Sequence, residues 1–293
     1  MKAKILTSLF LISTLLLQSC ISDLRSKSLK QEGLTTENEL KGKEMLESAW
    51  KKQGYQNLSK HRVYTFHGND TWKGMLGKVG NIWPQMKSEL QFKYKIGTFD
   101  GQVQFLDGKR KGDISGLQNW NYYEIPNQQE PTFSEENKRI TFGIAAIQYF
   151  TEMIDRIKNA PIISYAGEGE LRGKKYDLVF CTWHTEEPTD EADQYIAWIN
   201  KETGLMEFTQ YTIRENYLKT PGYKMVYGGV EFGNFKMVED VLIAHEHTVF
   251  TFDLKEKKKK NLHQLIISDF TFDAFESSEL ILDASIPMGG NFK

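Results

Sequence analysis

The sequence predicts an α+β protein dominated by one antiparallel sheet, with about eleven strands and two helices. The second half of the chain is a run of β-rich segments separated by turn residues, which is typical of sequential hairpins. Only two stretches space their apolar residues as a helix does. Aromatic residues make up 13% of the chain, which suits strands and large apolar surfaces.

The N-terminus has the pattern of an export signal. Met1-Lys2-Ala3-Lys4 is basic, and residues 5–17 are almost wholly apolar. This run is too short, and wrongly flanked, for a membrane-spanning helix. It ends in Leu17-Gln18-Ser19-Cys20, which resembles the lipobox of bacterial lipoproteins. That resemblance implies a signal peptide over residues 1–19 and lipidation of Cys20; the alternative is an ordinary signal with a chance cysteine.

The segment after the signal is polar, rich in Ser and Lys, and without apolar periodicity. We therefore expect residues 20–35 to be a flexible tether and residues 36–293 to be a single domain.

Two amphipathic helices are predicted. The first begins at a capping box, Thr36-x-x-Glu39, and ends near Gly54. The second covers residues 142–158 and ends before Pro161, because proline disfavours helix at the preceding residue. Its apolar stripe should lie against the sheet.

The predicted strands alternate apolar and polar residues or are rich in β-branched and aromatic residues. Asp107-Gly108 and Arg172-Gly173 are turn signals between neighbouring strands. The strands cover residues 63–66, 90–94, 102–106, 120–125, 162–171, 175–183, 194–200, 205–214, 228–238, 241–252 and 262–272.

Composition excludes some classes of protein. The formal net charge is −2, with 37 basic and 39 acidic residues, so we expect no nucleic-acid partner. Cys181 is the only cysteine besides Cys20, so no intramolecular disulfide is expected once Cys20 is acylated. No second apolar run reaches 18 residues, and an N-terminal lipid would therefore be the only membrane anchor. The oligomeric state stays open.

The order of elements resembles the half-barrel of the lipoprotein carriers LolA and LolB. Residues 195–208 look like that family's strand-turn-strand, and so does Ile266-x-Ser268-x-Phe270 near the C-terminus. Taken whole, the chain looks most like uncharacterised lipoproteins of Bacteroidota. The resemblance implies a curved, incomplete barrel wrapped around helices, with an apolar cavity for lipid or lipoprotein acyl chains. It also implies a non-enzymatic protein without a cofactor, lipid-anchored in the cell envelope, at the outer membrane and facing the periplasm.

A set of strand aromatics could line such a cavity. The alternative is a filled core, which would favour a structural or partner-binding lipoprotein. The set is Trp183, Trp198, Phe208, Phe250 and Phe270.

A metal-dependent hydrolase is the second alternative. His245 and His247 point to one face of a strand, and His184 could approach from another strand end. The competing interpretation places both strand histidines on a solvated face. The chain has no H-E-x-x-H signature.

Two further features have simple interpretations. Residues 74–80 hold three glycines and are expected to form a turn or a loop over a cavity mouth. Cys181 lies mid-strand and is expected to be a buried apolar residue.

Overall fold

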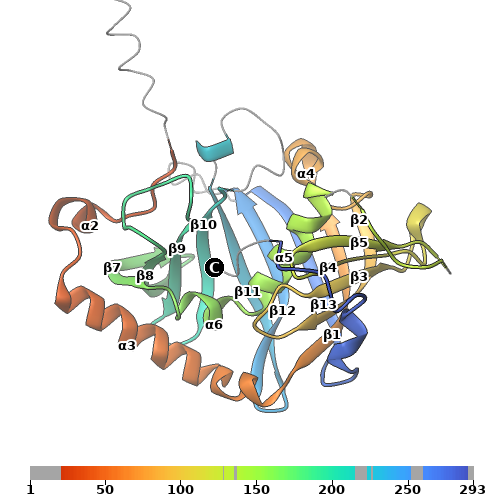
Figure 1. The fold of residues 1–293 in the computed structure, drawn as a ribbon. Coiled ribbons are helices and arrows are strands. Elements are labelled where there is room, and N and C mark those ends of the chain that lie inside the picture. Colours follow the sequence, from red (N-terminus) through yellow and green to blue (C-terminus); the bar gives the residue numbers. More distant parts are fainter. Residues whose placement is uncertain are drawn as a thin grey trace, which may run out of the picture.

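The computed structural model describes residues 21–127, 129–134, 137–214, 223–225, 227–251 and 260–289. Cys20 and the predicted signal peptide lie outside these residues. Within them, thirteen antiparallel strands form one sheet in the order β6-β5-β4-β3-β2-β1-β13-β12-β11-β10-β9-β8-β7. Figure 1 shows this open sheet curving around helix α5.

The strands confirm the predicted meander. They are β1 (Val63–Trp72), β2 (Lys87–Lys95), β3 (Gly101–Phe105), β4 (Ile114–Gln118), β5 (Asn121–Ile125), β6 (Thr132–Phe133), β7 (Ile162–Leu171), β8 (Lys174–Thr182), β9 (Gln194–Asn200), β10 (Met206–Thr212), β11 (Tyr227–Val238), β12 (Val241–Thr251) and β13 (Lys260–Phe272).

The structure has five helices in its described part, where the sequence predicted two. They are α2 (Lys27–Glu32), α3 (Thr36–Lys52), α4 (Gly74–Gly80), α5 (Lys138–Thr151) and α6 (Met153–Ile157). Short 3-10 segments are η1 (Tyr55–Lys60), η2 (Gly108–Arg110), η3 (Tyr223–Met225) and η4 (Ser277–Leu280). None of the described helices is long and apolar enough to span a membrane.

The predicted strands could be recognised because buried apolar residues alternate in them with more exposed polar residues. In β2, Leu90, Phe92 and Tyr94 are fully buried, while the residues between them are partly exposed. Strands β4 and β6 were not predicted. β4 reads Ile-Ser-Gly-Leu-Gln, which has low β-propensity, but its Gly116 lies opposite Tyr123 in the register. A Cβ at Gly116 would lie 2.1 Å from the Tyr123 ring, so the glycine makes room for that ring.

The two predicted helices exist with shifted ends. Thr35, rather than Thr36, caps α3: its hydroxyl accepts a 3.3 Å hydrogen bond from the amide of Asn38. The second helix is broken at Glu152 into α5 and α6.

Apolar residues are buried on both faces of the sheet. The inner face packs on α5, α6 and α3 and forms the main core. On the other face lies a smaller group that we call the outer cluster, made of Leu29, Ala166, Tyr176, Phe180, Ile196, Trp198, Phe208 and Phe250. All seven residues of β9 are therefore buried.

The segment predicted as a flexible tether lies on this outer cluster. Leu29 of α2 is 4% exposed, and Leu24 and Leu34 pack beside it. The leucines lie too far apart for a helical stripe, so the sequence pattern did not reveal that they contact the sheet.

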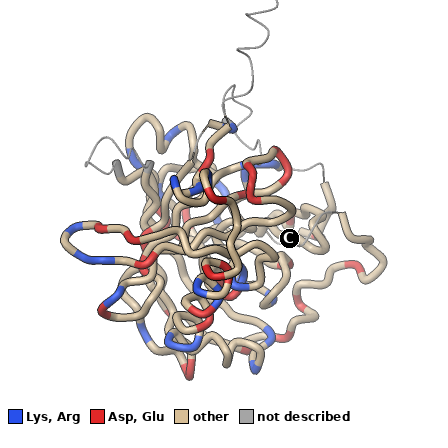
Figure 2. The backbone as a smooth tube through the Cα atoms, turned by 90° about the vertical axis from the view of Figure 1, so that its left-hand side faces the viewer, with Lys and Arg blue, Asp and Glu red and all other residues tan. Residues whose placement is uncertain are grey.

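Charges on the surface are mixed in sign. Figure 2 shows Lys and Arg interspersed with Asp and Glu along the described chain.

Candidate functional site

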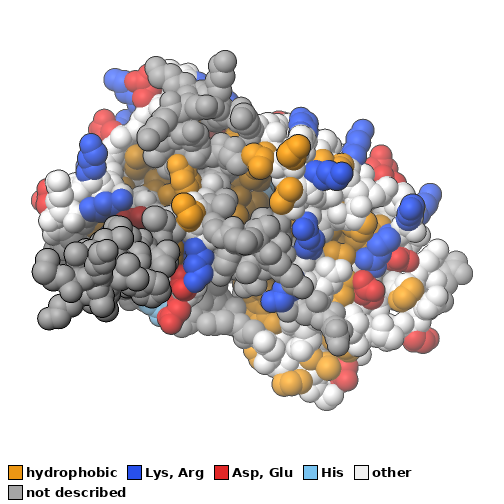
Figure 3. Space-filling model, turned by 90° about the horizontal axis from the view of Figure 1, so that it is seen from above, with side chains coloured by type: hydrophobic (Ala, Val, Ile, Leu, Met, Phe, Trp, Pro, Cys, Tyr) orange, Lys and Arg blue, Asp and Glu red, His pale blue; other side chains and the backbone are white. Residues whose placement is uncertain are grey.

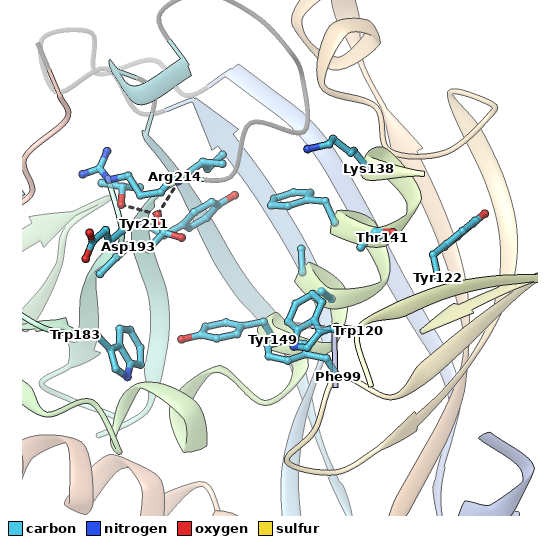
Figure 4. A pocket seen from close by; sticks show the side chains of 18 of the residues that line it. Phe99, Trp120, Tyr122, Lys138, Thr141, Tyr149, Trp183, Asp193, Tyr211 and Arg214 are labelled. Carbon is cyan, nitrogen blue, oxygen red and sulfur yellow. Dashed lines mark hydrogen bonds between the residues drawn. The ribbon is translucent and has the colours of Figure 1, made fainter. Parts of the chain in front are cut away.

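A cavity lies between α5 and the sheet. It encloses about 800 Å³ and is bounded by α5, β5, β9 and β10, and by the C-terminal segment at Ile286. This volume is within the range of sites for small ligands. Figure 4 shows side chains from α5 and from the strands pointing into the space between them.

Aromatic rings form most of the wall. Phe99 contacts Trp120 at 4.5 Å between ring centroids and Tyr149 at 6.3 Å. Tyr149 of α5 stacks on Tyr195 of β9 at 5.5 Å, so a row of rings runs from one side of the cavity to the other. The other aromatic lining residues are Tyr122, Phe133, Phe142, Phe150, Trp183 and Tyr211.

Burial favours the neutral form of three phenol groups in this wall. Burial raises the pKa of Tyr122 to about 12, and it raises the pKa of Tyr149 and Tyr195 further. At these three positions the cavity therefore offers rings and neutral hydroxyl groups.

Some buried donors on the wall make no hydrogen bond within the described chain. Among them are the hydroxyl of Thr141 on α5 and the indole nitrogen of Trp120. Thr141 is only 7% exposed, so bulk water does not solvate its hydroxyl. A ligand atom or a bound water can satisfy these groups.

One end of the cavity is polar. A carboxylate oxygen of Asp193 accepts 2.9 Å hydrogen bonds from the Thr212 hydroxyl and from the backbone amide of Arg214. The guanidinium of Arg214 donates to the carbonyl oxygens of Ser22, at 2.7 Å, and Lys224, at 3.1 Å. This end of β10 is thereby joined to the N-terminal segment.

The first residue of α5, Lys138, carries a positive charge. Lys138 is exposed, lines the cavity and makes no ion pair with any residue that the structure describes. Its side chain in Figure 4 extends from α5 toward the β10 side of the cavity.

Of the five aromatics predicted to line a cavity, only Trp183 does so. Trp198, Phe208 and Phe250 belong to the outer cluster, on the opposite face of the sheet. Phe270 lies in the main core, stacked on Tyr64 at 5.2 Å. Because both faces of these strands are buried, the presence of an aromatic residue did not indicate which face it occupies.

The histidines do not converge. His245 and His247 are 4% and 1% exposed and face the main core, so the predicted solvated face is wrong. The Nδ1 atom of His245 lies 3.1 Å from the carbonyl oxygen of Ile243, and burial lowers the pKa of His247 to about 3. His184 lines the cavity instead. No group of three His, Cys, Asp or Glu residues in the described ranges is arranged to hold a metal.

Cys181 is buried in the main core, and burial raises its pKa, which disfavours the reactive thiolate.

The sequence interpretation missed most of the cavity wall. Tyr149 and Phe150 fell within the predicted second helix and Tyr122 within a predicted strand, and none of the three was singled out as a cavity residue. The available signal was the number of aromatic residues on the second helix, more than a single packed stripe needs.

The chain shares its fold with solved structures of low sequence identity. A DUF1329 family protein from Desulfovibrio piger aligns over 83% of this chain and 98% of its own, with a TM-score of 0.52 and 12% identity. A domain from Vibrio parahaemolyticus, named for outer-membrane lipoprotein sorting, aligns over 83% and 97%, with a TM-score of 0.51 and 12% identity. A LolA superfamily protein from Nitrosomonas europaea covers 82% of this chain and 96% of its own, at a TM-score of 0.49 and 8% identity.

No protein-family model and no curated sequence matches the chain. The two likenesses above 0.5 support the predicted architecture, a curved antiparallel sheet around a helix, and at 12% identity they concern the fold alone.

Proposed function

We propose that this protein is a lipid-anchored protein of the cell envelope that binds the acyl chain of a lipid or lipoprotein in the cavity beside α5, without catalysis. The observation that carries the proposal is the aromatic cavity of about 800 Å³ within a LolA-like sheet. An alkyl chain gains free energy by leaving water for such a wall, at roughly 25 cal/mol per Å² buried.

The polar end of the cavity suits a head group. Lys138 would attract a phosphate or carboxylate, while the Thr141 hydroxyl could donate a hydrogen bond to a ligand oxygen. An acyl chain would then lie along Tyr149 and Phe99, with its head near the N-terminus of α5.

The anchor would be Cys20, acylated after removal of residues 1–19, as the lipobox implies. We propose the periplasmic side of the outer membrane as the location. Residues 21–35 would be part of the folded unit in place of a free linker, because Leu29 packs on the outer cluster.

The test is native mass spectrometry of the chain from Ile21 to Lys293, purified without detergent, followed by organic extraction of bound molecules. Residues 21–35 are kept because they cover the outer cluster. We expect a co-purified lipid or fatty acid, and after its removal we expect saturable binding of a fluorescent fatty acid.

A matched pair of variants distinguishes the cavity from other apolar surfaces. Ala146 is half-buried on α5 and lines the cavity, so Ala146→Phe should fill the space and abolish binding. Leu40→Phe adds an aromatic ring at a position that is 64% exposed on α3 and should leave binding unchanged. A clean apo mass together with no fatty-acid binding would refute the proposal.

A further inference from the structure

The surface helix α4 exposes its apolar side chains to solvent instead of packing them on the core. It buries Gly77 and exposes Met75, Leu76 and Val79 to 83%, 53% and 44%. A helix on the surface of a soluble domain normally turns its apolar side chains toward the core. These three residues are adjacent on one short helix, so they form an exposed apolar patch that needs a partner.

The structure holds this patch outward. The amide of Lys73 donates a 2.8 Å hydrogen bond to the carbonyl of Leu262, and a Cβ at Gly77 would lie 3.0 Å from that same oxygen. On the other side, the Arg139 guanidinium donates to the carbonyls of Val79 and Asn81 at 2.9 and 2.8 Å. Because Arg139 belongs to α5, the patch is fixed to the helix that lines the cavity.

The charges around α4 are basic. Lys73 and Lys78 are exposed and form no ion pair with other described residues, and no acidic residue occurs from 71 to 84. Figure 3, which views the molecule from the end where α4 lies, shows hydrophobic side chains next to Lys and Arg. Apolar side chains among lysines match the interface of a bilayer that contains anionic lipids.

The N-terminal segment reaches the same end of the molecule. The amide of Ser22 donates a 2.9 Å hydrogen bond to the carbonyl of Lys224, next to Met225, which is 57% exposed. Cys20 is only two residues before Ser22, a reach of roughly 7 Å. Figure 1 shows the first described residues, η3 and α4 at one end of the sheet.

The polar end of the cavity also lies there. Arg214, which holds Ser22, and Lys138, at the start of α5, are both lining residues. Figure 4 places both at the end of the cavity nearest α4 and η3.

We infer that this end of the molecule, formed by Met75, Leu76, Val79 and Met225, rests on the membrane that holds the lipid anchor, so that the cavity opens toward the bilayer. The inference rests on the proposed function for its anchor and its ligand. It adds an orientation: an acyl chain would pass between bilayer and cavity without crossing water.

The experiment uses the full chain, lipid-anchored in vesicles of phosphatidylethanolamine and phosphatidylglycerol. Leu76→Cys is labelled with an environment-sensitive fluorophore. Met237→Cys, 62% exposed at the far end of β11, is the matched control. Cys181 is buried and will not compete for the label.

We expect the emission of the label at position 76 to shift to the blue when the protein is on vesicles. We also expect that label to lose most of its fluorescence when the vesicles carry spin-labelled acyl chains. Neither effect is expected at position 237. Equal access of aqueous iodide to both labels would overturn the inference, and so would protection of position 76 without vesicles, which would indicate a protein partner. Should Cys20 prove unmodified by mass, Cys20→Ser removes its free thiol before labelling, and the labelled chain is added to preformed vesicles and judged by the same two signals. Lipid extraction from the same sample reports separately on the proposed cavity ligand.

Discussion

The carboxylate of Glu152 forms an ion pair with the guanidinium of Arg156, with 2.8 Å between oxygen and nitrogen, at the break between α5 and α6. The same carboxylate accepts hydrogen bonds from the Tyr64 hydroxyl at 3.1 Å, the Gln148 amide at 3.0 Å and the backbone amide of Gly97 at 3.2 Å. Burial raises the pKa of Glu152 while Arg156 opposes that shift. The pair therefore joins the helix that lines the cavity to the centre of the sheet.

Replacing this acid should destabilise the fold strongly. Glu152→Gln keeps the shape but leaves the Arg156 guanidinium, only 11% exposed, without its countercharge. Breaking a buried pair from one side costs about 3–5 kcal/mol, which urea denaturation would measure. Glu47→Gln removes a surface carboxylate that pairs with Lys51 and should cost under about 1 kcal/mol. Equal losses of stability in Glu152→Gln and Glu47→Gln would contradict the stabilising role of the buried Glu152–Arg156 pair.

His247 should make the fold sensitive to acid. Burial lowers its pKa to about 3, against 6.5 in the unfolded chain, so between these values only the unfolded state takes up the proton. Above pH 6.5 the imidazole is neutral in both states and takes nothing from the stability. As the pH falls from 6.5 toward 3, the free energy of unfolding decreases by about 1.4 kcal/mol per pH unit.

The measurement is the pH dependence of the unfolding free energy. His247→Leu should have a shallower slope than the unmodified protein between pH 6 and 4, whatever its absolute stability. His67→Asn, at a histidine whose side chain is 47% exposed, serves as the comparison for the loss of a surface histidine. A slope unchanged in His247→Leu would show that this imidazole takes up no extra proton on unfolding.

Leu29 should hold the N-terminal segment on the sheet. Its side chain is 4% exposed in the outer cluster, so Leu29→Ser removes the main apolar contact of α2. We expect faster amide hydrogen exchange over residues 22–33, with exchange in β9 changed much less. Gln31→Ser, at an exposed position of the same helix, should leave exchange as it is. Uniform acceleration throughout the sheet would indicate instead that the segment is needed for the whole fold.

Thr141 should matter to the head of a ligand. Its hydroxyl makes no hydrogen bond within the described chain, so Thr141→Val should not lower, and can raise, the stability of the empty protein. If the hydroxyl donates to a ligand oxygen, fatty-acid affinity should fall roughly two- to tenfold, the equivalent of one hydrogen bond. Binding of an alkane of equal length should not change. Titration calorimetry or dye displacement distinguishes these results.

The sheet could be predicted because its strands follow simple alternation. Residues 162–171 and 194–200 were predicted with the observed ends, where turn residues flank a clear pattern. Strand β4 could not be predicted in this way, because Gln118 is a buried polar residue whose partner lies far along the chain: its side chain donates to the carbonyl of Asp283. Such a contact has no local signal.

The cavity was the least predictable feature. Its wall depends on which face of each strand is covered by α5 and which by the N-terminal segment. Since β9 is buried on both faces, Trp198 and Tyr195 are equally good aromatic candidates in the sequence, yet only Tyr195 faces the cavity. α4 was also beyond local rules: three glycines in seven residues argue against a helix, and only the close contact of Gly77 with Leu262 explains it.

The pairing of β1 with β13 has a consequence for biosynthesis. Tyr64 lies opposite Phe272, so the central seam of the sheet joins segments about two hundred residues apart. A ribosome-bound chain that has not yet released residues 260–272 cannot connect the half-sheet from β1 to β6 with the half-sheet from β7 to β12. Contacts of this sequence separation form slowly, so closure waits for the last strand. Late closure is compatible with the proposed export, in which the polypeptide would pass through a translocation channel before it adopts its native structure.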